Sequence, residues 1–220
     1  CTILSNDRRR ALLDVAAQMS RRQNRRIPIF YDLAYELLLH DPAAPPFTSV
    51  LPVDDLDIAY EIGTLSKILA PGLRIGYLLG PPGPFLDAMI QKTSDTGFSA
   101  PLFVQEMASW LLDHHIAEQL RSVNAGYREK ALAVSAAIQS ELGPHLQSCI
   151  GGQAGFYFYL TFRDTPTHPD SAFFQRLAQP RDRDLPKVIY IPGTYCVHPR
   201  GDLAEIGRRQ LRLSYGFEET

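Results

Sequence analysis

The 220-residue sequence contains only three cysteines, and they lie far apart, at Cys1, Cys149 and Cys196. Their odd number and wide spacing fit neither a disulfide framework nor the paired CxxC spacing of a zinc site. We therefore expect no bound metal, and a reducing, cytoplasmic location.

The sequence also lacks long hydrophobic runs and an excess of charge of either sign. No segment approaches the roughly 18 consecutive apolar residues of a membrane helix, and no charged leader precedes a short apolar run. The 22 basic residues are balanced by 24 acidic ones, so no overall positive field attracts nucleic acid or an anionic membrane. We therefore predict small-molecule partners, without nucleic acid or membrane.

What the sequence does contain is 45% hydrophobic and 21% charged residues, a balance typical of a globular protein. The first apolar pattern recurs at helical spacing after Ser5, which is suited to cap a helix N-terminus. Arginines flank this pattern, and we expect them to form its solvated face. These arginines are Arg8, Arg9, Arg10, Arg21, Arg22, Arg25 and Arg26.

The order of patterns along the chain predicts two domains. Short runs rich in β-forming residues, at 27–31, 58–62 and 74–79, alternate with helical and turn segments, which favours an α/β layer with a largely parallel sheet. Residues 101–142 predict one long or bent helix. Isolated strands at 156–162, 188–191 and 210–215 then surround a short helix at 171–177. We place the domains at residues 1–125 and 126–220, the second being a smaller α+β domain.

The most informative segment is Thr-Leu-Ser-Lys-Ile-Leu-Ala-Pro-Gly-Leu-Arg-Ile-Gly, which runs from Thr64 to Gly76. It resembles the signature around the pyridoxal-phosphate (PLP) lysine of class I/II aminotransferases, and every position of that pattern is filled. The resemblance covers essentially the whole chain. It implies an α/β fold, namely the C-terminal portion of a PLP fold type I large domain, mostly parallel sheet with helices, plus a smaller α+β C-terminal domain.

The resemblance assigns roles to several residues of this segment. Lys67 would be the catalytic lysine and would hold pyridoxal 5'-phosphate, because an aldehyde cofactor needs an amine to form an imine. Thr64, Ser66 and Arg74 would bind its phosphate, since short hydroxyls and a planar guanidinium suit phosphate oxygens. Gly72 would keep the backbone close and unobstructed.

A second segment, Tyr31-Asp32-Leu33-Ala34-Tyr35, resembles the family segment that holds the cofactor ring. The resemblance implies that Asp32 keeps the pyridine nitrogen protonated and that Tyr35 hydrogen-bonds the phenolic oxygen of the ring. From the residues alone, Asp32 also fits a helix or turn cap, and Tyr35 also fits core packing.

Near the C-terminus, the resemblance implies that Arg212 binds the substrate carboxylate, because a guanidinium fork suits a carboxylate. Arg208 and Arg209 are nearby competitors for that role. Tyr195 and His198 lie in a segment similar to a loop that faces the substrate side chain, and packing or surface positions are the alternative. The glycine-rich segment at 151–155 resembles a turn before the first small-domain strand, where glycine supplies positive φ.

The implied function is transfer of an amino group between an amino acid and a 2-keto acid by a homodimer. Three alternatives remain: a PLP-dependent C–S lyase or decarboxylase on the same fold, a PLP-sensing aminotransferase-like module of a transcription regulator, and a structural domain without cofactor. The resemblance begins partway through the family's large domain. We therefore expect a longer native chain that supplies further contacts to the phosphate and the ring.

Overall fold

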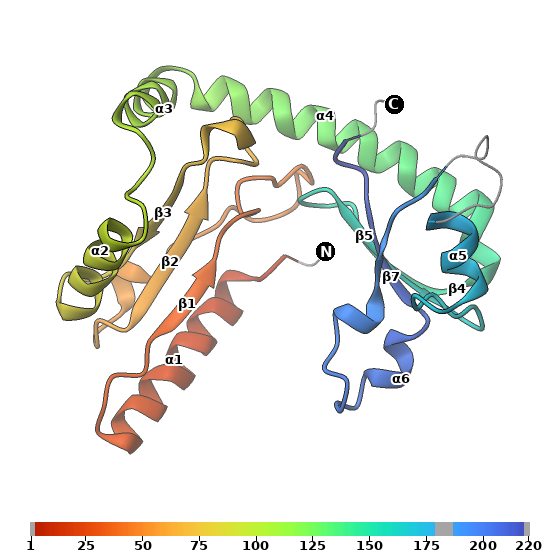
Figure 1. Cartoon of the computed structure of the whole chain (residues 1–220), viewed down its shortest axis with the longest axis horizontal. Coiled ribbons are helices and arrows are strands. Elements are labelled where there is room, and N and C mark those ends of the chain that lie inside the picture. The colour runs from red at the N-terminus through yellow and green to blue at the C-terminus, as the bar shows by residue number, and fades with distance from the viewer. Residues whose placement is uncertain (1–2, 179–186, 218–220) are drawn as a thin grey trace. The chain divides into compact units, whose positions relative to one another are not determined.

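The computed structural model describes residues 3–178 and 187–217, and the chain divides into two compact units. The N-terminal unit spans Ile3–Asn124, and the C-terminal unit begins at Ala125. Each unit has a sheet and a hydrophobic core of its own (Figure 1).

The N-terminal unit is built on a three-stranded sheet and helix α1. The strands are β1 (Ile29–Asp32), β2 (Ala59–Thr64) and β3 (Gly76–Leu79), in the order β1-β2-β3. Strands β1 and β2 are parallel, whereas β3 is antiparallel to β2. Helix α1 (Asn6–Gln23) runs alongside β1 (Figure 1), and the Ser5 hydroxyl caps it by accepting the Arg8 N–H at 3.2 Å, as predicted.

Helix α1 buries one stripe of side chains, spaced four residues apart, against the sheet. Leu13 and Ala17 of this stripe pack with Tyr31 and other buried residues in one cluster. Arg9 lies one turn earlier on the same stripe and is only 1% exposed. The expectation that Arg9 is solvated was therefore wrong, because its helical position directs it at the core. The other six arginines of the two groups are exposed, as expected.

The remaining helices up to residue 142 differ in part from the prediction, and the last of them extends past the unit boundary at Asn124. Helix α2 (Pro84–Asp95) was not predicted, and it buries no residue of its own. The expected long or bent helix over 101–142 is interrupted at His115, which separates α3 (Leu102–His114) from α4 (Ile116–Ala137), and α4 continues into a π-helical turn (Ile138–Leu142). Two 3₁₀ turns, η1 and η2, complete the unit. They span Leu51–Val53 and Pro71–Leu73.

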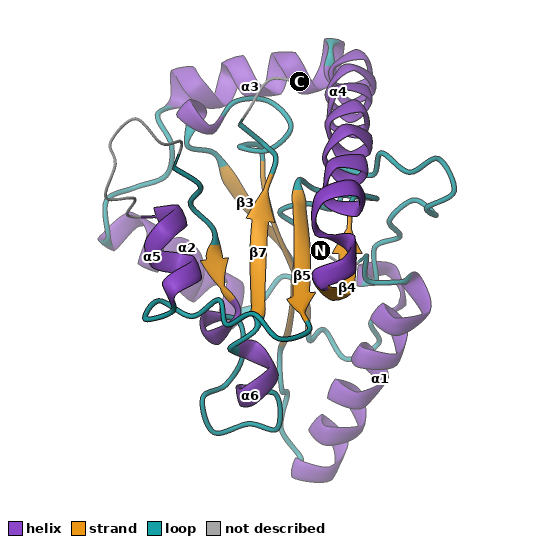
Figure 2. Ribbon diagram, turned by 90° about the vertical axis from the view of Figure 1, so that its right-hand side faces the viewer, coloured by secondary structure: helices purple, strands orange, loops and turns teal. Residues whose placement is uncertain are grey.

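The C-terminal unit contains an antiparallel sheet in the order β4-β5-β7-β6. Figure 2 shows β5 and β7 side by side. Strand β4 was not predicted, because half of its residues are glutamine, serine or glycine and only Leu146, at its start, is buried. The strands are β4 (Leu146–Gly151), β5 (Tyr157–Phe162), β6 (Ile191–Pro192) and β7 (Gln210–Ser214). The helices are α5 (Ala172–Ala178) and α6 (Ala204–Gly207), with 3₁₀ turns at Gly143–His145 and Gly193–Tyr195.

The turn between β4 and β5 needs glycine for conformational reasons. Gly151, Gly152 and Gly155 have φ values of 127°, 82° and 62°, in a region that side chains with a Cβ rarely adopt. The prediction of a positive-φ glycine turn at this place is confirmed.

The described residues contain neither a membrane-spanning helix nor a cluster of metal-binding side chains. Within residues 3–178 and 187–217, no helix has both the length and the apolar character needed to cross a membrane. In the same residues, no three His, Cys, Asp or Glu side chains are grouped in a way that could hold a metal ion.

Candidate functional site

The chemistry-bearing residues of the N-terminal unit follow the carboxyl ends of two parallel strands. Asp32 is the last residue of β1 and pairs in register with Ile62 of β2, which itself ends at Thr64. Lys67 lies in the turn that follows β2. Because parallel strands end at the same edge of a sheet, this register brings Asp32 and the Lys67 turn to one edge, where α/β proteins usually bind ligands.

The Lys67 turn is shaped by the side chain of Thr64. The Thr64 hydroxyl donates to the Ile75 carbonyl at 3.0 Å, accepts the Ser66 N–H at 3.1 Å and lies 3.0 Å from Ser66 Oγ. The Leu65 N–H also donates to Ile75, at 3.1 Å. Lys67 is half-buried. The hydroxyls of Thr64 and Ser66, which we expect from the sequence to bind the phosphate, thus lie together at the base of the Lys67 turn.

Tyr35 lies in a neighbouring turn and faces Lys67. The Leu33 N–H donates to the Ile62 carbonyl at 2.7 Å, and the Asp32 carboxylate accepts the Ala34 N–H at 3.0 Å, so the turn is fixed to both strands. The Lys67 Nζ atom is 5.8 Å from the centre of the Tyr35 ring, within the range of a cation–π contact. The structure therefore brings Lys67, Tyr35 and Asp32 to the same end of the sheet.

Two amides of α4 hold the backbone next to these turns. Gln119 donates to the carbonyl of Ile68, one residue after the lysine, at 3.1 Å. Asn124 donates to the carbonyl of Leu37, two residues after Tyr35, at 3.0 Å. Sequence reasoning missed both residues, because a polar side chain within a helical pattern gives no sign of the distant carbonyl that it meets.

Arg74 and Gly72 lie on the far limb of the same loop. Arg74 has a left-handed conformation, with φ 54°, and its exposed guanidinium donates to the Pro71 carbonyl at 3.2 Å. A Cβ placed on Gly72 would meet no atom within 4 Å. No contact within the described chain therefore requires glycine at that position.

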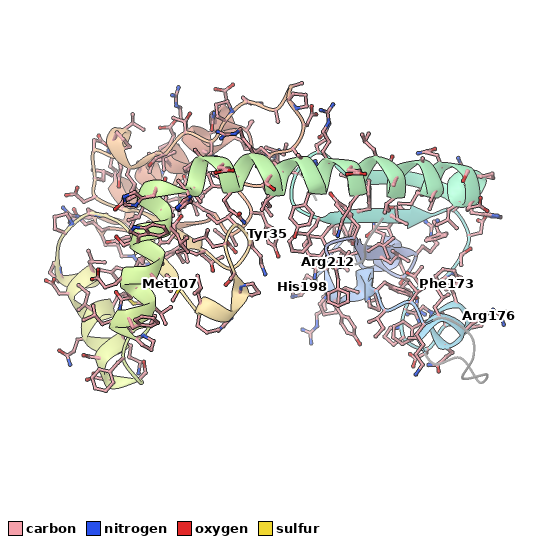
Figure 3. The ribbon with its side chains drawn as sticks, turned by 90° about the horizontal axis from the view of Figure 1, so that it is seen from above. Tyr35, Met107, Phe173, Arg176, His198 and Arg212 are labelled. Carbon is pink, nitrogen blue, oxygen red and sulfur yellow. The ribbon has the colours of Figure 1, made fainter. Side chains whose placement is uncertain are left out.

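The proposed carboxylate-binding arginine, Arg212, belongs to the C-terminal unit and is labelled with His198 in Figure 3. Its guanidinium carbon lies 4.5 Å from the centre of the Tyr157 ring. Arg212 Nε is buried and has no hydrogen-bond partner among the described residues. The sequence did not single out Tyr157. Tyr157 lies two residues before Tyr159, the register partner of Arg212, and this pairing of β5 with β7 is known only from the structure.

The competing arginines are engaged elsewhere. Arg208 Nη2 lies 3.1 Å from His168 Nε2, and Arg209 donates to the Phe162 carbonyl at 3.0 Å. Tyr195, by contrast, is 71% exposed and His198 is also exposed. Of the three arginines near this strand, Arg212 is therefore the best suited to bind an added anion.

Burial also sets the ionisation of a neighbouring group. Removal from water, with a smaller contribution from Cys196, raises the pKa of Tyr159 to about 12. Tyr159 donates its hydroxyl to Gln210 Oε1 at 3.0 Å. On the face of β5 and β7 that presents Arg212, this phenol therefore stays neutral to a more alkaline pH than an exposed tyrosine does.

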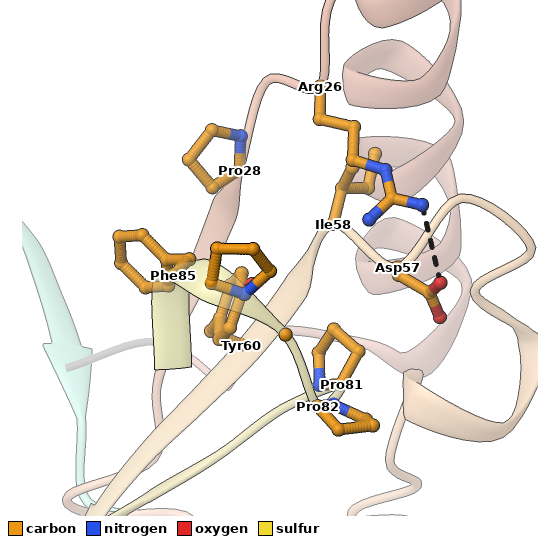
Figure 4. Close-up of a pocket in the computed structure, with 10 residues that line it drawn as sticks. Arg26, Pro28, Asp57, Ile58, Tyr60, Pro81, Pro82 and Phe85 are labelled. Atoms are coloured by element: carbon orange, nitrogen blue, oxygen red, sulfur yellow. Dashed lines mark hydrogen bonds and ion pairs between the residues drawn. The ribbon is translucent and has the colours of Figure 1, made fainter. Parts of the chain in front are cut away.

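A pocket of about 290 Å³ lies at the opposite end of the N-terminal sheet (Figure 4). It includes Ile58 and Tyr60, at the start of β2, and a proline-rich segment after β3. Its charged members, Arg26 and Asp57, pair with each other at 3.5 Å. Lys67 follows the other end of β2, so this pocket is not the lysine site. Its lining residues are Arg26, Pro28, Asp57, Ile58, Tyr60, Pro81, Pro82, Gly83, Pro84 and Phe85.

The chain is similar to both enzymes and regulators among curated proteins. An HTH-type transcriptional regulator of Bacillus subtilis, YisV, is 28% identical over 218 residues, which is 98% of this chain and 40% of the regulator. The 2-aminoadipate transaminase of Thermus thermophilus is 32% identical over 81 residues, 37% of this chain and 20% of the enzyme. The chain thus spans less than half the length of these relatives.

Solved structures share the fold. The α-aminoadipate aminotransferase LysN of Thermus thermophilus, complexed with N-(5'-phosphopyridoxyl)-L-leucine, superposes with a TM-score of 0.76 at 23% identity, over 96% of this chain and 49% of LysN. A kynurenine aminotransferase of Pyrococcus horikoshii, in complex with PMP, gives 0.74 at 22% identity, over 98% of this chain and 48% of that enzyme. The family model for aminotransferase class I and II matches residues 10–217. The chain therefore belongs to the class I and II aminotransferase family.

Proposed function

We propose that the chain is part of a PLP-dependent aminotransferase, which transfers an amino group between an amino acid and a 2-keto acid. The observation that carries the proposal is the placement of Lys67 in the turn after β2, facing Tyr35, with Asp32 at the end of the adjacent strand. This arrangement puts an amine, a phenol and a carboxylate at one edge of a parallel strand pair.

The residues present fit the cofactor. PLP needs an amine for its aldehyde, a carboxylate for its ring nitrogen and a donor for its phenolic oxygen, and Lys67, Asp32 and Tyr35 supply these groups. Its phosphate needs donors and open backbone. The hydroxyls of Thr64 and Ser66 lie at the base of the turn, and Gly72 adjoins open space. Glycine at a position with no internal demand for it supports close approach by a bound group.

The chain's own residues would then divide the work. When bound, PLP supplies an electron sink next to the substrate α-carbon. Lys67 would hold the cofactor and move the α-proton on its Nζ atom. Asp32 would hold a proton on the ring nitrogen, while Tyr35 donates to the phenolic oxygen. We assign the substrate carboxylate to Arg212, because its buried Nε lacks a partner in the described chain.

The first test is Lys67→Ala. The wild-type chain, incubated with PLP and reduced with borohydride, should carry a covalent adduct that peptide mapping places on Lys67. The variant should lose the adduct and the visible absorbance of bound PLP, because no amine remains at that position. Lys92→Ala is the matched control, since Lys92 is an exposed lysine of the same unit, on α2.

An adduct on Lys67 that Lys92→Ala preserves is the expected result. No adduct in the wild-type chain, or equal labelling of the Lys67→Ala variant, would remove the proposal. Release of a 2-keto acid from an added amino acid then measures amino transfer itself.

A second candidate function is a PLP-sensing module of a transcription regulator. The observation in its favour is the 28% identity to an HTH-type regulator across 98% of this chain. A sensor would form the same Lys67 adduct but would release no keto acid in repeated turnover. Product analysis with a panel of amino acids therefore separates the two functions. A homodimer and a cytoplasmic location form part of the main proposal, and sedimentation of the chain tests the dimer.

A further inference from the structure

A buried ion pair lies directly beside the turn that carries Tyr35. Arg9 Nη2 of α1 is 2.6 Å from Glu36 Oε1, and the two side chains are only 2% and 17% exposed. Arg9 Nε and Nη2 are both buried, and neither makes a hydrogen bond of normal geometry with a described residue, so Arg9 and Glu36 meet as a pair of opposite charges. The proposed function gives no task to either residue.

The surroundings of Arg9 leave its guanidinium little freedom. It lies over the Phe47 ring, 4.7 Å from the ring centre, and the Tyr31 hydroxyl donates to the Arg9 carbonyl at 2.9 Å. Arg9 is thus fixed by its helix, by an aromatic face and by a residue of β1. An arginine held in this way is a rigid point of attachment for the carboxylate of Glu36.

Glu36 connects this point to Tyr35. The two residues are consecutive in the turn, and the Glu36 N–H donates to the Leu33 carbonyl at 3.2 Å. Leu33 in turn donates to Ile62 of β2. The ion pair thus holds the turn at the residue directly after Tyr35.

A buried ion pair is weak evidence for a stabilising role, because desolvation offsets much of its attraction. The pair does, however, fix geometry. Because a buried charge without its partner is costly, the Arg9 and Glu36 side chains stay in contact. We propose that Arg9 and Glu36 are positioning residues, which hold Tyr35 in place for the phenolic oxygen of bound PLP. The inference rests on the proposed function, because that function assigns Tyr35 to the cofactor.

The experiment measures the pH midpoint of the visible absorbance of PLP bound at Lys67, in the full chain. A hydroxyl that donates to the phenolic oxygen stabilises the anionic form of that oxygen, so its loss moves the midpoint to higher pH. The Tyr35→Phe variant, which lacks the hydroxyl, measures how large this shift in the midpoint is when the hydrogen bond is lost. The charged side chains that the proposed function places around the cofactor, Asp32, Lys67 and Arg74, are unchanged in the variants compared.

Glu36→Gln should shift the midpoint in the same direction, by about half or more of the Tyr35→Phe shift. In the Tyr35→Phe background, Glu36→Gln should add no further shift, because a residue that acts through Tyr35 has no effect once its hydroxyl is gone. Arg21→Met is the matched control. It removes a charge from the same helix, where Arg21 pairs with Asp55 in the open, and should leave the midpoint unchanged.

Since Glu36→Gln leaves a buried charge without its partner, a second variant guards against misfolding. The double variant Arg9→Met/Glu36→Leu removes both charges, a replacement that is often neutral for stability. It should melt near the wild-type temperature and still show the shifted midpoint. If Tyr35→Phe shifts the pH midpoint but Glu36→Gln and the double variant both keep the wild-type midpoint, the inference is overturned and the proposed function stands. No Lys67 adduct in the wild-type chain would instead remove the proposed function and the inference with it.

Discussion

At the scale of single residues, two glycines of the N-terminal unit differ in the space that surrounds them. A Cβ on Gly80, just after β3, would lie 2.7 Å from Cε1 of Tyr60 and so overlap the ring of this buried residue. Gly72, in the loop after Lys67, adjoins open space. Glycine at position 80 thus serves packing, whereas glycine at position 72 has no such reason within the described chain.

We predict that this difference appears as a split between stability and binding. Gly72→Ala should change the free energy of unfolding by less than about 0.5 kcal/mol, as surface substitutions do, and should weaken PLP binding about tenfold, ~1.4 kcal/mol. Gly80→Ala should instead cost about 1–3 kcal/mol of stability, because it overpacks the core. Denaturant unfolding and absorbance titration measure the two effects. Unaltered PLP affinity in Gly72→Ala would show that the phosphate lies elsewhere.

The candidate residues around the lysine could be singled out from the sequence because they lie close together along the chain. The segment from Thr64 to Gly76 contains Lys67, both hydroxyls and Arg74 within one loop, so its pattern is readable without the fold. Arg9 and Glu36 are far apart in sequence and meet only after α1 packs on the sheet. Only the helical spacing of Arg9 with Leu13 and Ala17 could have suggested its burial.

At the scale of elements, the start of β2 depends on one carboxylate. Asp54 Oδ2 accepts the N–H groups of Ile58 and Ala59 at 2.7 and 2.6 Å, and its Oδ1 accepts the Leu56 N–H at 3.2 Å. Ile58 and Ala59 are almost completely buried. Without Asp54, these two donors at the beginning of the strand would lose their charged acceptor.

Asp54→Ala should therefore lower the free energy of unfolding of this unit by about 2–3 kcal/mol, because hydrogen bonds to charged groups are strong and buried donors are costly to leave unsatisfied. The neighbouring Asp55→Ala is the control. Its ion pair with Arg21 is exposed on both sides, so its loss should cost less than about 1 kcal/mol. Equal destabilisation by the two substitutions, in urea unfolding followed by circular dichroism, would contradict this account.

Elements were predictable where apolar residues form a regular, buried pattern. Strands β1, β2, β5 and β7 follow that rule, and the expected segments overlap all four. Strand β4 and helix α2 escaped prediction for different reasons. Strand β4 has no regular alternation of apolar and polar residues, so its periodic signal is weak. Helix α2 carries apolar residues at helical spacing, at Phe85, Leu86, Met89 and Ile90, and this pattern was overlooked in the sequence.

At the scale of the whole molecule, the two units differ in how burial has shifted their tyrosines. Burial raises the pKa of Tyr159, Tyr190 and Tyr215 to about 12, and all three belong to the C-terminal unit. Each hydroxyl also donates a hydrogen bond, to Gln210, to the Thr167 carbonyl and to the Gly155 carbonyl respectively.

These shifts predict alkaline unfolding of the C-terminal unit. A tyrosine whose pKa is raised on folding contributes stability that is complete below the unfolded value, about 10, and is lost as the pH rises towards 12. Each should cost about 1.4 kcal/mol per pH unit in that window. Tyrosinate absorbance and circular dichroism should therefore change together. Tyr190→Phe should make the loss less steep, whereas Tyr195→Phe, at an exposed site, should not. Ionisation of all three near pH 10 in the folded chain would contradict the prediction.

The connection between β1 and β2 is a place where the chain can accept insertions. The Asn6 side chain donates to the Pro46 carbonyl at 3.0 Å and accepts the Thr48 N–H at 3.1 Å, which fixes the part of the connection that leads back towards β2. Asp41 caps a local turn at its tip through the Ala43 N–H. Loop-closure entropy grows only with the logarithm of loop length. Insertions between Ala43 and Pro45 should therefore be tolerated in evolution, because they lengthen the path from Asp32 to Lys67 along the chain without altering their separation in space.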